Sequence, residues 1–82
     1  MSSVGLAQDE ALRLRQSGKI LALEHIITKA QAQHAGTILE AELNKEGGGY
    51  VYEVEILDAN GAVWEMRFNA RTGELLNTKK EH

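Results

Sequence analysis

The chain has 82 residues, of which 43% are hydrophobic and 26% charged, and its formal net charge is −3. This size and composition indicate one globular domain rather than a disordered chain. The acidic balance argues against a nucleic acid partner, because binding to a phosphate backbone requires a basic surface. The sequence contains no cysteine, which excludes disulfides, thiolate metal sites and a cysteine nucleophile. No apolar run approaches the ~20 residues that span a bilayer.

One feature of the first residues is typical of exported proteins, although such a short run of small residues also occurs by chance. Gly5-Leu6-Ala7 is a small-x-small triplet of the kind that precedes a signal cleavage site, and Gln8-Asp9-Glu10 suits the start of a mature chain. The basic and apolar regions of a signal peptide do not precede this triplet. We therefore expect residues 1–8 to be an N-terminal remnant or disordered lead, with the signal peptide itself missing.

Two helices are predicted ahead of the first strand. Residues 9–17 combine good helix formers with two acids in the first turn, two arginines later and Gly18 at the stop, an order that suits the helix dipole. A second helix is predicted over residues 22–35, because apolar side chains recur there at helical spacing. This stripe consists of Leu23, Ile26, Ile27, Ala30 and His34. Gly36 is predicted to end the helix as a left-handed C-cap.

Three strands are predicted after the helices. Residues 37–44 form the first, with Leu39, Ala41 and Leu43 inward and Ile38, Glu40 and Glu42 outward. A glycine-rich loop follows up to Gly49. Residues 50–76 alternate apolar and polar through two more strand-length runs, which places successive side chains on opposite sheet faces. The apolar face carries Tyr50, Tyr52, Val54, Ile56, Trp64, Met66, Phe68 and Ala70.

The register of the second and third strands follows from their turn. A two-residue turn would place Ile56 opposite Glu65 and mix core with charge. A three-residue loop over residues 59–61 instead pairs Ile56 with Trp64, and Glu53 with Arg67. That loop needs a positive φ at its last residue, which is Gly61. In this register Trp64 is predicted to be buried between the sheet and the second helix.

The predicted architecture is therefore α+β, with two helices packed on one face of a three-stranded antiparallel sheet in the order ααβββ. The domain is expected to span residues 9–77, and residues 78–82 to form a polar, frayed tail. The strands over 37–44 and 62–69 would both be sheet edges, so a homodimer through an unpaired edge is one interpretation of the chain.

The outer sheet face is the candidate partner-binding face, because acidic and apolar side chains gather there. It contains Glu40, Glu42, Glu53, Glu55, Glu65, Arg67, Val51 and Val63. Catalysis by two carboxylates needs environments that separate their pKa values, usually in a buried pocket, and an open sheet face lacks one. Two interpretations stay open: a solvated face that keeps the domain soluble, and a docking surface for a basic partner or a cation.

No catalytic, metal or cofactor site is predicted. His25 and His34 are nine residues apart, whereas a two-histidine pair on a helix needs a spacing of four. Asp58 opens a stretch that resembles the start of a calcium loop, but position twelve is Asn69 rather than glutamate. None of the serines lies in a nucleophile motif. We expect the chain not to be an enzyme and to need no cofactor.

Three short motifs in order resemble the PepSY family. They are Gly18-Lys19-Ile20-Leu21-Ala22-Leu23-Glu24 before a helix that ends near Gly36, the hairpin stretch from Val51 to Gly61, and Asn69-Ala70-Arg71-Thr72-Gly73-Glu74-Leu75-Leu76. The resemblance implies an α+β fold in an exported protein, with a role in regulating peptidases. It implies no catalytic residue.

These observations predict a non-enzymatic, exported interaction module that regulates or inhibits a peptidase or another extracytoplasmic partner. The alternative is a domain that senses a small ligand or cation through its acidic outer face. On either interpretation the expected location is periplasmic or secreted.

Overall fold

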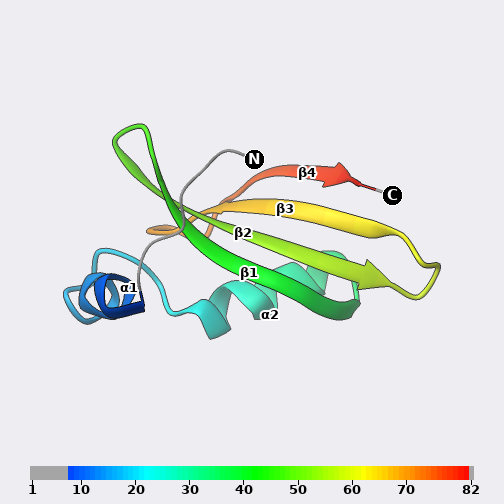
Figure 1. The fold of residues 1–82 in the computed structure, drawn as a ribbon, viewed down its shortest axis with the longest axis horizontal. Coiled ribbons are helices and arrows are strands. Elements are labelled where there is room, and N and C mark those ends of the chain that lie inside the picture. Colours follow the sequence, from blue (N-terminus) through cyan, green and yellow to red (C-terminus); the bar gives the residue numbers. More distant parts are fainter. Residues whose placement is uncertain (1–7, 82) are drawn as a thin grey trace.

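The computed structural model describes residues 8–81, and α1 (Gln8–Gln16) and α2 (Leu23–Gln33) precede a four-stranded sheet. The strands are β1 (Gly36–Glu46), β2 (Gly49–Asp58), β3 (Val63–Asn69) and β4 (Leu75–Lys80), all antiparallel in the order β1-β2-β3-β4. Figure 1 shows α2 beneath one face of the sheet and α1 at one end. Of the predicted lead over residues 1–8, only Gln8 is described, and it begins α1. The Gly5-Leu6-Ala7 triplet lies outside the described residues.

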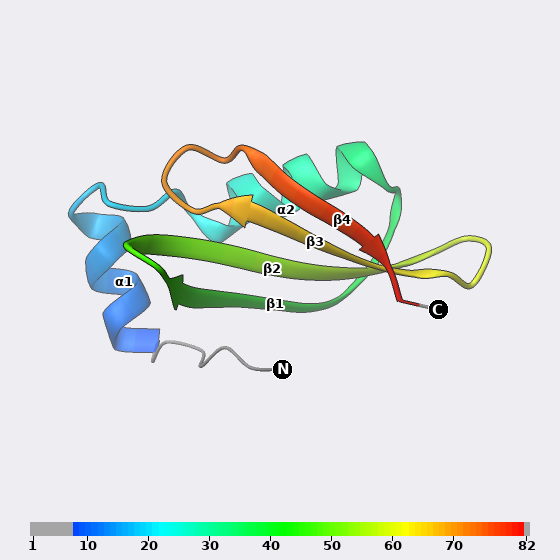
Figure 2. The same ribbon diagram turned by 90° about the horizontal axis from the view of Figure 1, so that it is seen from above.

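The α+β class and both helices are confirmed, but the prediction of three strands is wrong. The prediction that both helices pack on one sheet face is also wrong, because only α2 covers the face and α1 lies at one end. The segment predicted to fray contains half of β4, residues 78–80, and this strand pairs with β3 through partners such as Met66 and Thr78. All its residues after Leu75 are exposed, so backbone pairing holds this strand and no alternating apolar pattern marks it. As a result β3 is an inner strand, and the sheet edges are β1 and β4 (Figure 2).

Gly36 has a different role from the one predicted. α2 ends at Gln33, and its C-cap residue is His34, whose backbone is extended and whose N–H donates to the carbonyl oxygen of Ala30. Gly36 has no positive φ and begins β1. A Cβ at this position would lie 2.2 Å from the carbonyl oxygen of Leu57. Glycine is therefore needed because β1 and β2 approach closely here, and the C-cap prediction is wrong.

A bulge in β1 reverses the predicted facing of two residues. Ile38 pairs with Ile56, but Glu40 pairs with Glu55, so Leu39 is an extra residue in β1. Its side chain is 50% exposed, whereas Ile38 packs against the core. Period-two alternation cannot anticipate an inserted residue, and the inward prediction for Leu39 fails for that reason.

The predicted β2–β3 register is confirmed. Ile56 pairs with Trp64, and Glu53 with Arg67. Gly61 has φ +83°, as the three-residue loop requires. One carboxylate oxygen of Asp58 accepts hydrogen bonds from the backbone N–H groups of residues 60 and 62, both at 2.9 Å.

Trp64 is less buried than predicted. Its indole is half-buried, stacks on His34 with ring centroids 4.2 Å apart, and donates from Nε1 to Asp58 Oδ2 at 2.9 Å. Its neighbour His34 is the C-cap residue that follows the last turn of α2. The core proper consists of Ile20, Ile26, Ala30, Leu43, Tyr52, Val54, Ile56, Met66, Phe68 and Ala70.

Hydrogen bonds join the segment between the helices to the end of the sheet. The Tyr52 hydroxyl donates to the Leu21 carbonyl oxygen at 2.7 Å, and burial raises the pKa of this phenol. The Leu21 N–H donates to Ala70 O, and the Ala70 N–H donates to Tyr50 O. These bonds hold the α1–α2 connection beside the β1–β2 turn.

Candidate functional site

The sheet face opposite α2 brings together the five glutamates selected from the sequence. We call these residues the acidic face: Glu40, Glu42, Glu53, Glu55 and Glu65. Strand pairing places Glu40, Glu55 and Glu65 in one row across β1, β2 and β3, and Glu42, Glu53 and Arg67 in the next row. The five carboxylates line a hollow of about 30 Å³. Like charges directly opposite each other in a sheet are mutually destabilising, so this arrangement needs counter-charges.

Arg67 supplies the main counter-charge. From β3 its guanidinium forms ion pairs with Glu53 on β2 and with Glu46 on β1, so the side chain spans three strands. The three side chains are only 25%, 19% and 32% exposed, respectively. The hydrogen bond to Glu46 raises the pKa of Arg67, and burial opposes this rise. Sequence reasoning missed Glu46 because it placed this residue in the flexible loop.

The Arg67 bridge divides the predicted face into an open part and a closed part. It crosses the row in which Asn44 pairs with Val51. Val51 is 8% exposed, and Asn44 is fully buried. Neither side-chain polar atom of Asn44 has a hydrogen-bond partner among the described residues. Val51, a candidate contact residue, is therefore largely covered and leaves little surface for a partner. Val63, at the other end of the sheet, is half-buried.

The unpredicted strand β4 adds a cation at the rim of the face. Lys79 pairs in register with Glu65 and lies 3.8 Å from its carboxylate and 3.6 Å from that of Glu81. Partial burial raises the pKa of Glu65, and the negative charge of Glu53 adds to the rise. The charge balance of this face thus depends on a strand that apolar periodicity does not reveal.

His25, His34 and Asp58, which were considered as metal ligands, do not form a metal site among the described residues. His25 is exposed, and His34 is occupied by its stack on Trp64. Within residues 8–81 no group of three or more His, Cys, Asp or Glu side chains is placed to hold a metal ion. Both carboxylate oxygens of Asp58 accept hydrogen bonds, and the bond from the Trp64 indole is the largest cause of its lowered pKa. None of the described helices is long and apolar enough to cross a membrane.

The turn from β3 to β4 is built by the third sequence motif. Asn69 Oδ1 accepts the backbone N–H groups of Arg71 and Thr72 at 2.9 and 3.1 Å. Gly73 has φ +82°, and a Cβ there would lie 2.7 Å from Lys29 Cε. The motif residues are thus accounted for by turn formation and by close packing against α2.

The family model of the peptidase propeptide and YPEB domain, PepSY, matches residues 17–79. The chain belongs to the PepSY family. The match extends from the end of α1 to β4 and includes both β-turns described above. PepSY domains occur in extracytoplasmic proteins and are associated with peptidase propeptides and their regulation.

Among curated proteins, this PepSY chain is similar to the uncharacterized protein YkoJ of Bacillus subtilis (strain 168). The two are 34% identical over 56 residues, which is 61% of this chain and 33% of YkoJ. The chain thus spans about one third of the length of this relative. No solved structure matches the chain.

Proposed function

We propose that the chain is a non-enzymatic interaction module whose acidic face docks on a basic surface of an extracytoplasmic protein, with a peptidase as the partner class. The observation that carries this proposal is the row of Glu40, Glu55 and Glu65 across three adjacent strands. Across the face, five glutamates meet two nearby cations, Arg67 and Lys79. A basic partner would relieve the remaining repulsion, and complementary charge of this kind mainly raises the association rate.

Membership of the PepSY family supports the choice of partner class and of compartment. We infer a periplasmic or secreted location on the same basis. Immunodetection of the protein in separated cytoplasmic and extracytoplasmic fractions tests this inference, and recovery only in the cytoplasmic fraction would contradict it.

Cation or small-ligand sensing by the same face is the alternative function. The five carboxylates around the hollow of about 30 Å³ motivate it, because oxygen ligands suit hard cations. No three of them are placed to hold a metal ion within residues 8–81, so docking is the better supported function. A calcium- or zinc-dependent rise in melting temperature that disappears in Glu40→Gln/Glu55→Gln would establish sensing in place of protein docking. Pairing of two copies through a sheet edge is disfavoured by bulges in both edge strands, at Leu39 in β1 and at Leu76 in β4.

The docking proposal is tested with a charge reversal on the open part of the face. Glu40→Lys/Glu55→Lys changes two cross-strand neighbours that form no ion pair with a described residue, so the Arg67 bridge stays intact. The matched control is Asp9→Lys/Glu74→Lys, which changes the net charge equally on α1 and on the β3–β4 turn. Circular dichroism and thermal melts first establish that both variants fold.

The three proteins are immobilised and exposed to the extracytoplasmic fraction of the source organism. The proposal predicts a captured protein that wild type and control retain and the face variant loses. With that captured protein purified, its association rate with the wild-type chain should fall steeply with added salt. The peptidase activity of the captured protein, measured with and without the chain, distinguishes inhibition from docking alone. Equal capture by all three chains would refute docking through this face.

A further inference from the structure

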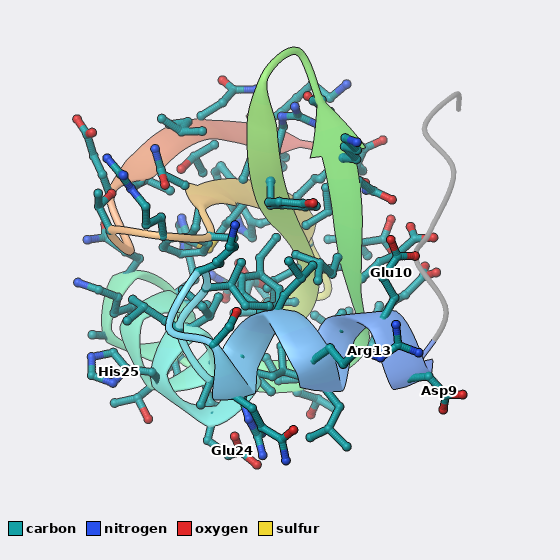
Figure 3. All side chains as sticks on the ribbon, turned by 90° about the vertical axis from the view of Figure 1, so that its left-hand side faces the viewer. Asp9, Glu10, Arg13, Glu24 and His25 are labelled. Atoms are coloured by element: carbon teal, nitrogen blue, oxygen red, sulfur yellow. The ribbon has the colours of Figure 1, made fainter. Side chains whose placement is uncertain are left out.

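A groove lies between α1 and the β1–β2 turn. Two adjoining hollows of about 800 and 840 Å³ form it, and they share Lys19, Gly48 and Tyr50. These volumes fall within the ~300–1,000 Å³ usual for ligand sites. Figure 3 shows α1 crossing this end of the molecule, with Asp9, Glu10 and Arg13 in its first turns. We call this feature the α1 groove.

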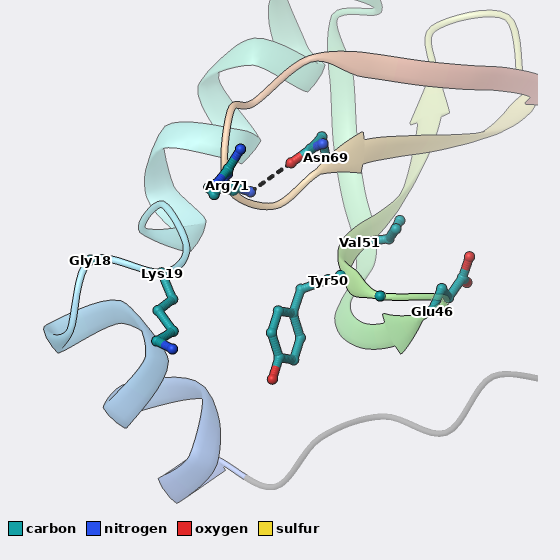
Figure 4. Close-up of a pocket in the computed structure, with 9 residues that line it drawn as sticks. Gly18, Lys19, Glu46, Tyr50, Val51, Asn69 and Arg71 are labelled. Atoms are coloured by element: carbon teal, nitrogen blue, oxygen red, sulfur yellow. Dashed lines mark hydrogen bonds between the residues drawn. The ribbon is translucent and has the colours of Figure 1, made fainter.

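The α1 groove is basic although the protein is acidic. Four cations line it: Arg13, Lys19, Lys45 and Arg71. All four are exposed, and none forms an ion pair with another residue of the described part of the chain. The two acids of its lining are Glu10 and Glu46, and Glu46 is engaged by Arg67 on the other side of the hairpin. In Figure 4, Lys19 and Tyr50 extend in the same direction, and Glu46 points away from them.

The groove also has an apolar floor and an open wall. Tyr50 and Leu14 are half-buried and pack against the core, so their outer surfaces provide apolar contact area. On the wall, nothing lies within 4 Å of the positions that a Cβ would occupy at Gly48 and Gly49. A ligand backbone can therefore approach the β1–β2 turn without meeting a side chain.

We propose that the α1 groove binds an extended, acidic polypeptide segment of a partner protein, with carboxylates at the four cations and an apolar side chain against Tyr50. An extended chain advances ~3.3 Å per residue, so alternate side chains of such a segment can reach the floor and the rim. A nucleic acid fits less well, because a phosphate backbone that extended past the groove would meet the acidic face on the same hairpin. This site is separate from the acidic face, and its test does not depend on whether the acidic face binds a partner.

The test uses the complete chain and a fluorescein-labelled peptide of sequence Glu-Leu-Glu-Leu-Glu-Glu, with its Gln-Leu-Gln-Leu-Gln-Gln counterpart as ligand control. Binding is followed by fluorescence anisotropy at low and physiological salt. Lys19→Glu and Arg71→Glu are the groove variants. Lys80→Glu is the matched variant, since it makes the same charge change on β4, where Lys80 pairs with Trp64 at the far end of β3. Thermal melts verify that all variants are folded.

Wild type should bind the glutamate peptide about tenfold or more tightly than the glutamine peptide, and added salt should weaken this binding. Each groove variant should lose about tenfold in affinity, and Lys80→Glu should stay within about twofold of wild type. Equal affinity for the two peptides, or an equal loss in Lys80→Glu, would overturn the proposal. Tighter binding of a twelve-nucleotide oligothymidylate, lost in the groove variants, would reassign the groove to nucleic acid. Concentration-dependent dimers that Lys19→Glu abolishes would reassign it to a second copy of the chain.

Discussion

Replacement of Arg67 by methionine is the perturbation that examines the acidic face most closely. Methionine keeps an apolar stem on the sheet but removes the charge that Glu46 and Glu53 share. In the variant both carboxylates lose their cationic partner, and the negative charge of the neighbouring Glu65 is less well balanced. We expect Arg67→Met to destabilise the fold, because repulsion on the face is then opposed mainly by Lys79 at its rim.

The magnitude follows from the burial of the bridge. Exposed ion pairs contribute ~0–1 kcal/mol, and breaking a fully buried pair costs ~3–5 kcal/mol. The three side chains of the bridge are 19–32% exposed and so lie between these limits, which gives a loss of about 2 kcal/mol. For a domain of this size, that loss lowers the melting temperature by roughly 8–16 °C.

Urea unfolding followed by circular dichroism measures the loss. Lys79→Met is the control, since Lys79 is 61% exposed and its two ion pairs are long, and it should cost less than ~1 kcal/mol. Added NaCl should restore part of the stability of Arg67→Met by screening the carboxylates. A loss in Arg67→Met no larger than in Lys79→Met would refute the assignment of Arg67 as the counter-charge of the face.

Three further predictions concern the turns and close approaches that position the face. Gly36→Ala should cost ~1–3 kcal/mol by steric overlap with the β2 backbone, while Gly49→Ala, with open space around it, should be tolerated; equal melting temperatures would contradict the close approach. Gly61→Val should destabilise more than Gly48→Val, because only Gly61 of the two has a positive φ, and thermal melts compare them. Because the pKa of Asp58 is lowered in the folded state, the ionised carboxylate stabilises the fold fully above its ordinary pKa of 3.8, and this stabilisation is lost as the pH falls through the lower folded-state pKa. Asp58→Asn should therefore flatten the loss of stability at acid pH. An unchanged acid dependence would show that other groups cause it.

Much of the fold could be predicted because periodicity and turn chemistry agree in the middle of the chain. The β2–β3 register could be predicted because a pairing of Ile56 with Glu65 would place a charge in the core. Gly61 is also in the loop position that requires a positive φ. The bulge at Leu39 and the strand β4 could not be predicted, since an extra residue leaves no mark in composition and β4 buries little side-chain surface. Gly36 was misassigned because a glycine after a helix suits both a C-cap and a close strand approach.

The site was predictable in part for the same reason. Alternation along β1, β2 and β3 is enough to place the five glutamates on one face. The ion pairs that control this face, from Arg67 to Glu46 and from Lys79 to Glu65, depend on the length of β1 and on the presence of β4. The α1 groove joins residues of α1, the β1–β2 turn and the β3–β4 turn, and this proximity arises only in the folded chain.

The most direct test of docking through the acidic face is an NMR titration of the ¹⁵N-labelled chain with the protein captured from the extracytoplasmic fraction. Docking through this face predicts shifts or broadening at the amides of Glu40, Glu55 and Glu65, and their absence in Glu40→Lys/Glu55→Lys. Changes confined to the exposed side of α2, at residues such as Thr28 and Gln31, with the acidic face unaffected, would contradict the claim.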